Sequence, residues 1–183
     1  VSVNGSGVLI RKLPQRGMVG LTAAHLCDAP FKGISFTQIK VTAHDGRRYD
    51  ARVIKSVAET DICIFYLSEM KEGSYLRMSE TPPQVGDPAH TLSAPLSIFS
   101  PGASLIFKGY FSGRLRSDKD GYTIPTAPGS SGSPILNSHG RIIGMTSARF
   151  LGFENFCISP SYQLVKDMMD LAYEFKPPKG SGL

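Results

Sequence analysis

Short apolar runs separated by turn-forming residues dominate the chain. The runs are flanked by Gly, Pro, Asp and Ser, which is typical of strands in an all-β sandwich or barrel. They fall into two groups, one at 7–10, 18–24, 39–43, 51–57 and 61–67, and one at 88–94, 104–113, 121–125, 133–137, 141–147 and 156–159. The pattern therefore predicts an all-β fold built from two sets of strands.

The connector between the two groups divides the chain into halves. Residues 69–86 are rich in turn formers, so we expect a linker between an N-terminal β-barrel at 1–68 and a C-terminal β-barrel at 87–160. No internal sequence repeat relates the two halves. In the remaining segment, 161–183, apolar residues recur at helical spacing, which predicts an amphipathic helix over 160–175 followed by a loose tail. These apolar residues are Leu164, Val165, Met168, Met169, Leu171 and Ala172.

The composition is that of a soluble globular domain. The chain has 183 residues, of which 41% are hydrophobic and 19% charged, and no apolar stretch is long enough to cross a bilayer. The net charge of +5 permits contact with nucleic acid or an acidic membrane. The basic residues, however, are scattered in small groups, so the charge gives only weak support to a nucleic-acid partner.

The three cysteines, Cys27, Cys63 and Cys157, lack the paired spacing of a zinc site. Cys63 and Cys157 lie within apolar runs and are interpreted as small buried hydrophobic residues. An odd and sparse set of cysteines favours a reducing compartment, and no secretory signal opens the chain at Val1. We therefore expect a protein that is not secreted and that has neither a metal ion nor an organic cofactor.

The loop TAPGSSGSPIL at 126–136 contains the most specific pattern of the chain. Gly129 and Gly132 tolerate positive φ and Pro128 and Pro134 restrict φ, so a tight, predetermined turn is expected. Such residues also cluster in ordinary surface loops, and the loop alone leaves both interpretations open. A serine hydroxyl becomes a nucleophile only beside a base, which is usually a histidine oriented by a carboxylate.

His25 is the best candidate for that base. It follows a strand-like run that ends in two alanines, which leave room for the close approach of another segment. His44 and His139 lie in turn-like sequences, and His90 is compatible with a buried structural histidine. Asp61 opens the apolar run ICIFYL, so its carboxylate is expected to be partly buried and to need a donor such as an imidazole N–H. An aspartate that caps a strand end is the alternative interpretation.

Together, TAAHLC, the strand-opening Asp61 and GSSGSP resemble the chymotrypsin-fold serine proteases, which keep the chain order His, Asp, Ser. The resemblance covers nearly the whole chain, beginning with GSGVLI at 5–10. It implies two six-stranded antiparallel β-barrels with a C-terminal helix. It also implies that His25 is the general base, Asp61 its orienting carboxylate and Ser131 the nucleophile, with the backbone N–H groups of Gly129 and Ser131 as the oxyanion hole.

The pattern TxxGxSG, at Thr126, Gly129, Ser131 and Gly132, is similar to the polyprotein-processing proteases of sobemoviruses and poleroviruses. This similarity implies a viral serine endopeptidase that cuts its own precursor polyprotein in the cytoplasm of the infected cell. HtrA-like bacterial proteases are the alternative, because they share the TAAH and SG-P motifs. An inactive protease-fold binding module is a third interpretation, which the intact set of His, Asp and Ser disfavours.

The resemblance also places a P1 pocket between the nucleophile loop and the strand that follows it. The expected wall residues are Thr126, Pro128, Thr146, Ser147, Ala148, Arg149 and Asn155. Viral relatives that cut after Glu or Gln usually carry a histidine on that strand, and this chain does not. Thr126 and Asn155 would bind a polar P1 side chain and Arg149 an acidic one, but a solvated Arg149 paired with Glu154 is the favoured interpretation. The P1 preference therefore stays open.

Overall fold

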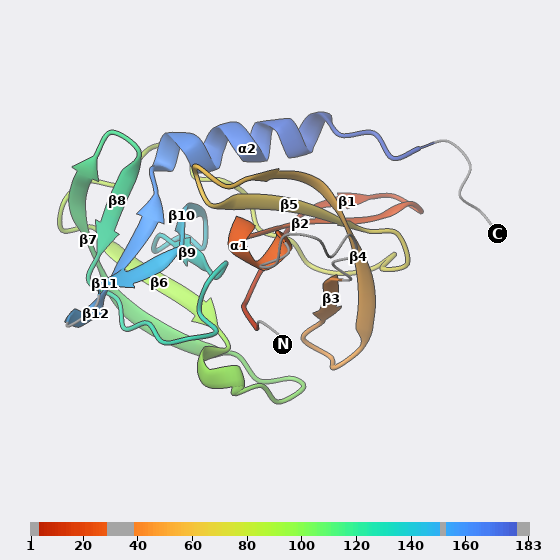
Figure 1. Cartoon of the computed structure of the whole chain (residues 1–183), viewed down its shortest axis with the longest axis horizontal. Helices are drawn as coiled ribbons and strands as arrows, with labels where there is room; N and C mark the ends of the chain where they lie inside the picture. The colour runs from red at the N-terminus through yellow and green to blue at the C-terminus, as the bar shows by residue number, and fades with distance from the viewer. Residues whose placement is uncertain (1–3, 29–38, 151–152, 179–183) are drawn as a thin grey trace.

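The strands form two antiparallel sheets in the computed structural model, which describes residues 4–28, 39–150 and 153–178 (Figure 1). The first sheet has the order β1-β2-β5-β4-β3, with β1 (Val8–Leu13), β2 (Gly17–Thr22), β3 (Ile39–Thr42), β4 (Arg48–Val57) and β5 (Ile62–Leu67). The second has the order β10-β9-β6-β7-β8-β12-β11, with β6 (Pro88–Ser93), β7 (Leu105–Arg116), β8 (Lys119–Tyr122), β9 (Pro134–Leu136), β10 (Ile142–Met145), β11 (Ala148–Phe150) and β12 (Phe153–Pro160).

The predicted fold class, two sets of strands with a C-terminal helix, is confirmed. The strand count differs from six and six, because five and seven strands are formed by the described residues. The run at 141–147 contributes only β10, and the additional strand β11 pairs with β12. The run at 18–24 also ends early, since its last residues turn into the short helix α1 (Ala24–Cys27).

The strands β2 and β5 are buried along their whole length. They pair with each other in the middle of the first sheet, from Met18 opposite Leu67 to Thr22 opposite Cys63. Burial on both faces explains why their sequences are almost continuously apolar, whereas the more peripheral β4 alternates. The end of β2 lies beside the start of β5, because Thr22 pairs with Cys63. The residues that follow β2 and those that precede β5 therefore meet at one end of this strand pair.

Helix α2 (Tyr162–Glu174) lies across both sheets (Figure 1). Its N-cap is Ser161, whose hydroxyl accepts from the backbone N–H of Leu164 at 3.4 Å. One hydrophobic cluster joins the helix to both sheets. It includes Leu21 and Ile62 from the first sheet, Ile142 and Met145 from the second, and Val165, Met169 and Ala172 from the helix. The helix therefore covers the junction of the two sheets.

Both ends of α2 are fastened by charged side chains. The fully buried carboxylate of Asp120, on β8, accepts from the backbone N–H of Tyr162 at 2.7 Å. At the other end Arg11, on β1, donates to the carbonyls of Ala172 and Phe175, at 2.9 Å each. Each bond satisfies helix-terminal backbone groups that have no partner within the helix. The second sheet thus holds the start of the helix and the first sheet holds its end.

The connector between β5 and β6 has little regular structure. Within the part of the chain that the structure describes, it forms one isolated bridge, between Met78 and Ile142. A second short helical turn, η1 (Pro95–Ser97), follows β6. None of the described helices has the length and the apolar character needed to cross a membrane. The domain boundaries at 68, 86 and 160 stay predictions.

The buried carboxylate of Asp120 offers a test of how α2 is anchored. Replacing Asp120 with Ala leaves the N–H of Tyr162 without its acceptor and removes the partner of Arg114, so we expect the free energy of unfolding to fall by about 3 kcal/mol. Urea denaturation measures this loss. Asp118→Ala is the control, since the backbone carbonyl of Asp118, and not its side chain, holds Ser161. Equal losses in the two variants would contradict the anchoring role.

Candidate active site

His25 lies on the short helix α1, directly after the central strand β2. The preceding Ala23 and Ala24 are fully buried, so the small side chains predicted to allow close approach are indeed packed inside. The side chain of His25 is 46% exposed and lies at the surface, at the end of the pair formed by β2 and β5. The imidazole is therefore held next to the core but open to solvent on one side.

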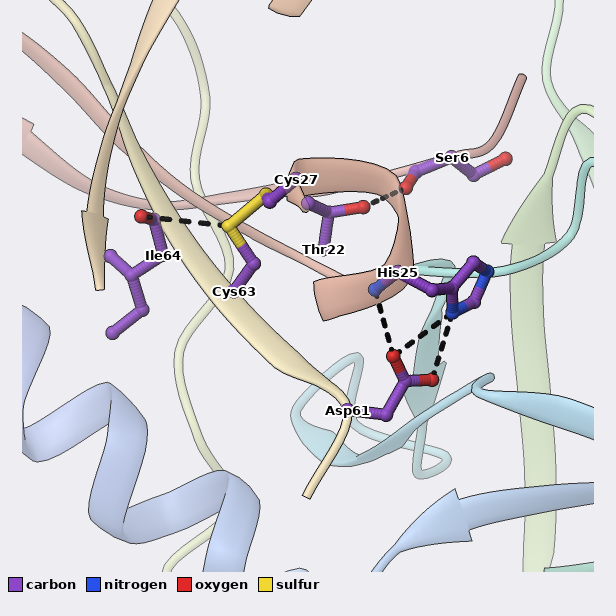
Figure 2. Close-up of a disulfide and its surroundings, with 7 residues drawn as sticks. All are labelled: Ser6, Thr22, His25, Cys27, Asp61, Cys63 and Ile64. Atoms are coloured by element: carbon purple, nitrogen blue, oxygen red, sulfur yellow. Dashed lines mark hydrogen bonds and ion pairs between the residues drawn. A yellow bond between two sulfur atoms is a disulfide. The ribbon is translucent and has the colours of Figure 1, made fainter. Parts of the chain in front are cut away.

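Asp61 lies directly before β5 and faces His25 (Figure 2). Its backbone is left-handed, with φ of 60°, which is uncommon for a residue with a side chain. Its Oδ1 accepts from the backbone N–H of His25 at 3.0 Å and lies 2.9 Å from the ring Nδ1, while Oδ2 lies 3.1 Å from the same nitrogen. The side chain of Asp61 is only 18% exposed. The partly buried carboxylate predicted to need an imidazole donor has one.

Ser147 supplies a third contact to this carboxylate. Its hydroxyl donates to Oδ2 of Asp61, and its backbone carbonyl lies 3.4 Å from Oγ of Ser131, which donates to it. Ser147 follows β10 and was expected as a wall of the P1 pocket. The structure places its side chain against Asp61, and its role in a P1 pocket stays a prediction. One residue thus links the carboxylate to the serine of the loop.

The contacts of Asp61 shift two pKa values in opposite directions. The hydrogen bond from Asp61 raises the pKa of His25 above 6.5, and the negative charge adds to this effect, while partial burial opposes it. Burial raises the pKa of Asp61, but the hydrogen bonds from His25 and Ser147 outweigh it and hold that pKa below 3.8. The ionised form of Asp61 is therefore stabilised, and this carboxylate in turn stabilises the imidazolium form of His25 relative to an isolated imidazole.

Ser131 stands in the turn between β8 and β9, which is shaped by two glycines. Gly129 and Gly132 have φ of 95° and 85°, where only glycine is free of strain, as the sequence predicts. The neighbouring Ser130 is 1% exposed, and its hydroxyl accepts from the backbone N–H of Ala127 at 3.3 Å. Ser130 thus faces inward, which distinguishes it from the partly exposed Ser131.

The residues expected to form the P1 pocket differ in exposure, and their role in that pocket stays a prediction. Thr146 is buried, whereas Pro128, Ala148 and Asn155 are exposed. The side chains of Arg149 and Glu154, and hence their expected ion pair, lie outside the described residues. Thr126 is half-buried. Among the residues that the structure describes, no group of three or more His, Cys, Asp or Glu side chains could hold a metal ion.

A disulfide that the cysteine pattern did not reveal lies beside the histidine and the aspartate (Figure 2). It joins Cys27, on α1, to Cys63, on β5, and both cysteines are buried. The expectation of reduced cysteines is therefore wrong, although the burial of Cys63 and Cys157 is confirmed. The sequence does contain a signal for this pairing. Cys27 and Cys63 lie two positions after His25 and Asp61, respectively, so segments that bring the histidine to the aspartate also bring the two cysteines close, and both pairs are separated by 36 positions. The bridge ties together the two segments that carry the imidazole and the carboxylate.

Comparison with known proteins gives the family of the chain. The family model described as a trypsin-like peptidase domain matches residues 5–145. The chain belongs to this family. The match confirms the expected class, a trypsin-like peptidase of the chymotrypsin fold.

Curated relatives of this trypsin-like peptidase domain are bacterial. The serine protease Do-like HtrA of Bacillus subtilis is 26% identical over 159 residues, which are 81% of this chain and 34% of that protein. The periplasmic serine endoprotease DegP of Escherichia coli K12 is 27% identical over 149 residues, 79% of this chain and 30% of that protein. The chain thus spans about a third of these relatives. A crystal structure of a serine endoprotease from Yersinia pestis shares the fold, with a TM-score of 0.74, 20% identity and coverage of 91% of this chain and 56% of that one.

These relatives correct two expectations. They are bacterial HtrA and DegP proteases and not viral ones, so the comparisons favour the HtrA-like alternative over the viral interpretation. The expected cytoplasmic localisation is wrong, because it rested on a viral origin and on reduced cysteines. The relatives from Escherichia coli and Chlamydia trachomatis are periplasmic, and Cys27 and Cys63 are paired.

Because of the disulfide, we expect the free energy of unfolding to depend on whether a reductant is present. Closing a loop of 36 positions restricts the unfolded chain, so reduction is expected to lower the free energy of unfolding by about 3–4 kcal/mol. Urea denaturation with and without dithiothreitol measures this difference. The double variant Cys27→Ala/Cys63→Ala should be insensitive to the reductant, while Cys157→Ala should respond like the parent. An equal response of the double variant would show that the bridge is not the cause.

The hydrogen bond between Asp61 and His25 predicts that the pKa of the histidine is raised. We expect the His25 ring to titrate above pH 6.5 and Asp61→Asn to lower its pKa, because the substitution removes the negative charge that favours the imidazolium. Two-dimensional NMR of the ring protons during a pH titration measures both values. Asp45→Asn is the control, because Asp45 pairs with Arg47 and not with His25, so the His25 titration should stay as in the parent. An unchanged His25 pKa in Asp61→Asn would contradict the pairing.

Proposed function

We propose that the chain is the protease domain of an HtrA-like serine endopeptidase in which His25, Asp61 and Ser131 are the catalytic residues. The observation that carries this proposal is the shared carboxylate. Asp61 binds the ring of His25 and the hydroxyl of Ser147, whose carbonyl accepts from Ser131. Three segments distant in sequence thus meet in one hydrogen-bonded set.

His25 acts as general base and then as general acid. Its Nδ1 faces Asp61, so the N–H is held on this nitrogen and Nε2, on the other edge of the ring, is left as the acceptor. Nε2 takes the proton of Ser131 as Oγ attacks the carbonyl carbon of the scissile peptide bond. The ionised Asp61 stabilises the imidazolium that forms. The same proton then passes to the leaving amine as the C–N bond breaks, which leaves an acyl group on Ser131.

Water completes the cycle by the same route. His25 accepts a proton from the water that attacks the acyl carbon, and the proton returns to Oγ of Ser131 as the ester bond breaks. Without substrate, the hydroxyl of Ser131 donates a long hydrogen bond, of 3.4 Å, to the carbonyl of Ser147. In the proposed reaction the hydroxyl rotates and donates to Nε2 of His25 in place of this carbonyl.

The backbone N–H groups of Gly129 and Ser131 form the proposed oxyanion hole. The positive φ of Gly129 supports this assignment, since it permits a sharp turn directly before the nucleophile. Loss of one such donor typically lowers the rate on the order of 10²–10³-fold. For the P1 pocket we propose Thr126, whose buried Oγ1 has no hydrogen-bond partner among the described residues. A polar P1 group would satisfy it.

The proposed substrate is a polypeptide chain in an oxidising compartment. The buried disulfide and the periplasmic relatives support that compartment. A precursor polyprotein and a nucleic acid, which the sequence left open as partners, find no support in the comparisons and are not part of this proposal.

A fluorophosphonate serine-hydrolase probe tests the proposed nucleophile. We expect the parent and Ser130→Ala to be labelled and to degrade fluorescein-labelled casein, whereas Ser131→Ala should lose labelling and at least about 10⁴-fold of the proteolytic rate. Ser130→Ala is the matched control because the two serines are adjacent. A folded parent that is neither labelled nor proteolytic would contradict the proposal and favour a binding module.

A further inference from the structure

Ser6, in the segment before β1, lies against the loop that holds Ser131. The backbone N–H of Ser6 donates to the carbonyl of Ser131 at 2.8 Å. Its hydroxyl donates to the carbonyl of Gly129 at 2.8 Å and accepts from the backbone N–H of Ala94 at 3.1 Å. The backbone carbonyl of Ser6 accepts from the hydroxyl of Thr22, at the end of β2 (Figure 2). The proposed chemistry does not use the side chain of Ser6.

Each of the four carbonyls from Pro128 to Ser131, in the nucleophile loop, has a hydrogen-bond donor. From Pro128 to Ser131 the four donors are Leu96 N at 2.6 Å, Ser6 Oγ at 2.8 Å, Ser133 N at 3.0 Å and Ser6 N at 2.8 Å. Three of these donors are backbone N–H groups, which a residue of almost any type could supply. The hydroxyl of Ser6 is the only side chain among the four. It is therefore the contact that depends on residue identity.

Fixing these carbonyls fixes the direction of the N–H groups. In a planar trans peptide the N–H points opposite to the C=O, so the held carbonyls of Pro128 and Ser130 set the directions of the N–H groups of Gly129 and Ser131. The peptide between Gly129 and Ser130 lies between these two donors, and the hydroxyl of Ser6 holds it. The N–H of the same peptide donates to the carbonyl of Ala127 at 3.0 Å, so the hydroxyl of Ser6 holds the carbonyl side of the peptide that sets how the two proposed oxyanion donors are oriented relative to each other.

The same hydroxyl also acts on the neighbouring segment at 94–97. Its bond to Ala94 holds the start of the segment whose Leu96 N–H binds Pro128. Leu96 and Ser97 both have positive φ, of 52° and 58°, which costs about 1 kcal/mol or more for each residue with a side chain. Such a segment keeps its conformation only when its surroundings fix it, and Ser6 supplies one of the fixing contacts.

Close contacts leave the loop little room to move. A Cβ on Gly132 would lie 2.1 Å from the carbonyl oxygen of Ser6, and one on Gly129 would lie 2.7 Å from that of Ala94. Both distances are far below van der Waals contact, so only glycine lets these segments approach. Ser6 therefore acts on a loop that is packed directly against it.

We infer that the hydroxyl of Ser6 is a positioning group for the oxyanion hole, reaching from the N-terminal segment to the nucleophile loop of the other sheet. This inference rests on the proposed function, because an oriented pair of N–H groups matters only if Ser131 is acylated. The hydroxyl of Ser6 contacts backbone atoms of Gly129 and Ala94 and acts through the peptides on either side of Gly129, so it is a positioning group and not a catalytic one.

Ser6→Ala tests this inference in the whole chain, because it removes the hydroxyl and keeps the backbone contacts. We expect the rate of fluorophosphonate labelling and the kcat for fluorescein-labelled casein to fall roughly 10- to 100-fold, with KM within about twofold of the parent. Urea unfolding should stay cooperative, with a midpoint only modestly lowered by the loss of the two hydrogen bonds of the hydroxyl, and the NMR titration of His25 should stay unchanged. Asn4→Ala is the matched control, because the Asn4 side chain bonds to Ser97 at 3.2 Å in the same neighbourhood and not to the carbonyl of Gly129, so its rate should stay near that of the parent.

The outcomes separate this inference from the proposed function. An unlabelled parent contradicts the proposed function itself. A labelled parent and a Ser6→Ala variant with the same rate contradict only the positioning role. Equal losses in Ser6→Ala and Asn4→Ala, or a Ser6→Ala chain that no longer unfolds cooperatively, would assign the hydroxyl to the stability of the fold and overturn the inference as well.

Discussion

The carboxylate of Asp61 is the point on which the site depends. It receives hydrogen bonds from the backbone and ring of His25, which follows β2 of the first sheet, and from Ser147, which follows β10 of the second. A partly buried carboxylate is costly without donors, so this arrangement persists only if both sheets are docked. The chemistry of the site and the packing of the two sheets are therefore coupled.

Several features outside the site serve this docking. Helix α2 lies across the junction and is fastened to one sheet through Asp120 and to the other through Arg11. Within the first sheet, the disulfide from Cys27 to Cys63 ties α1 to β5 beside the histidine and the aspartate (Figure 2). Ser6 reaches from the first sheet's leading segment to the loop of Ser131. Each of these contacts joins segments that are far apart in sequence, which suits a site assembled from strand ends.

Local features of the fold and of the site can be predicted from the sequence. Alternating turn formers and short apolar runs predict the two strand sets, helical spacing predicts α2, and the settings of His25 and Asp61 indicate one pair among several histidines and acids. Contacts that depend on three-dimensional approach could not be predicted this way. The hydroxyl of Ser147 reaches Asp61 from 86 positions away, and the pairing of Cys27 with Cys63 requires α1 to lie beside β5. The cysteine number supported the wrong compartment, because an odd count conceals one bridge and one buried thiol.

The most direct test of the proposed triad is a crystal structure of the chain after reaction with diisopropyl fluorophosphate. We expect phosphorus bonded to Oγ of Ser131, with the phosphoryl oxygen about 2.7–3.1 Å from the backbone nitrogens of Gly129 and Ser131 and with His25 still paired to Asp61. Phosphorus on another residue, or a phosphoryl oxygen that points away from both nitrogens, would contradict the proposed mechanism.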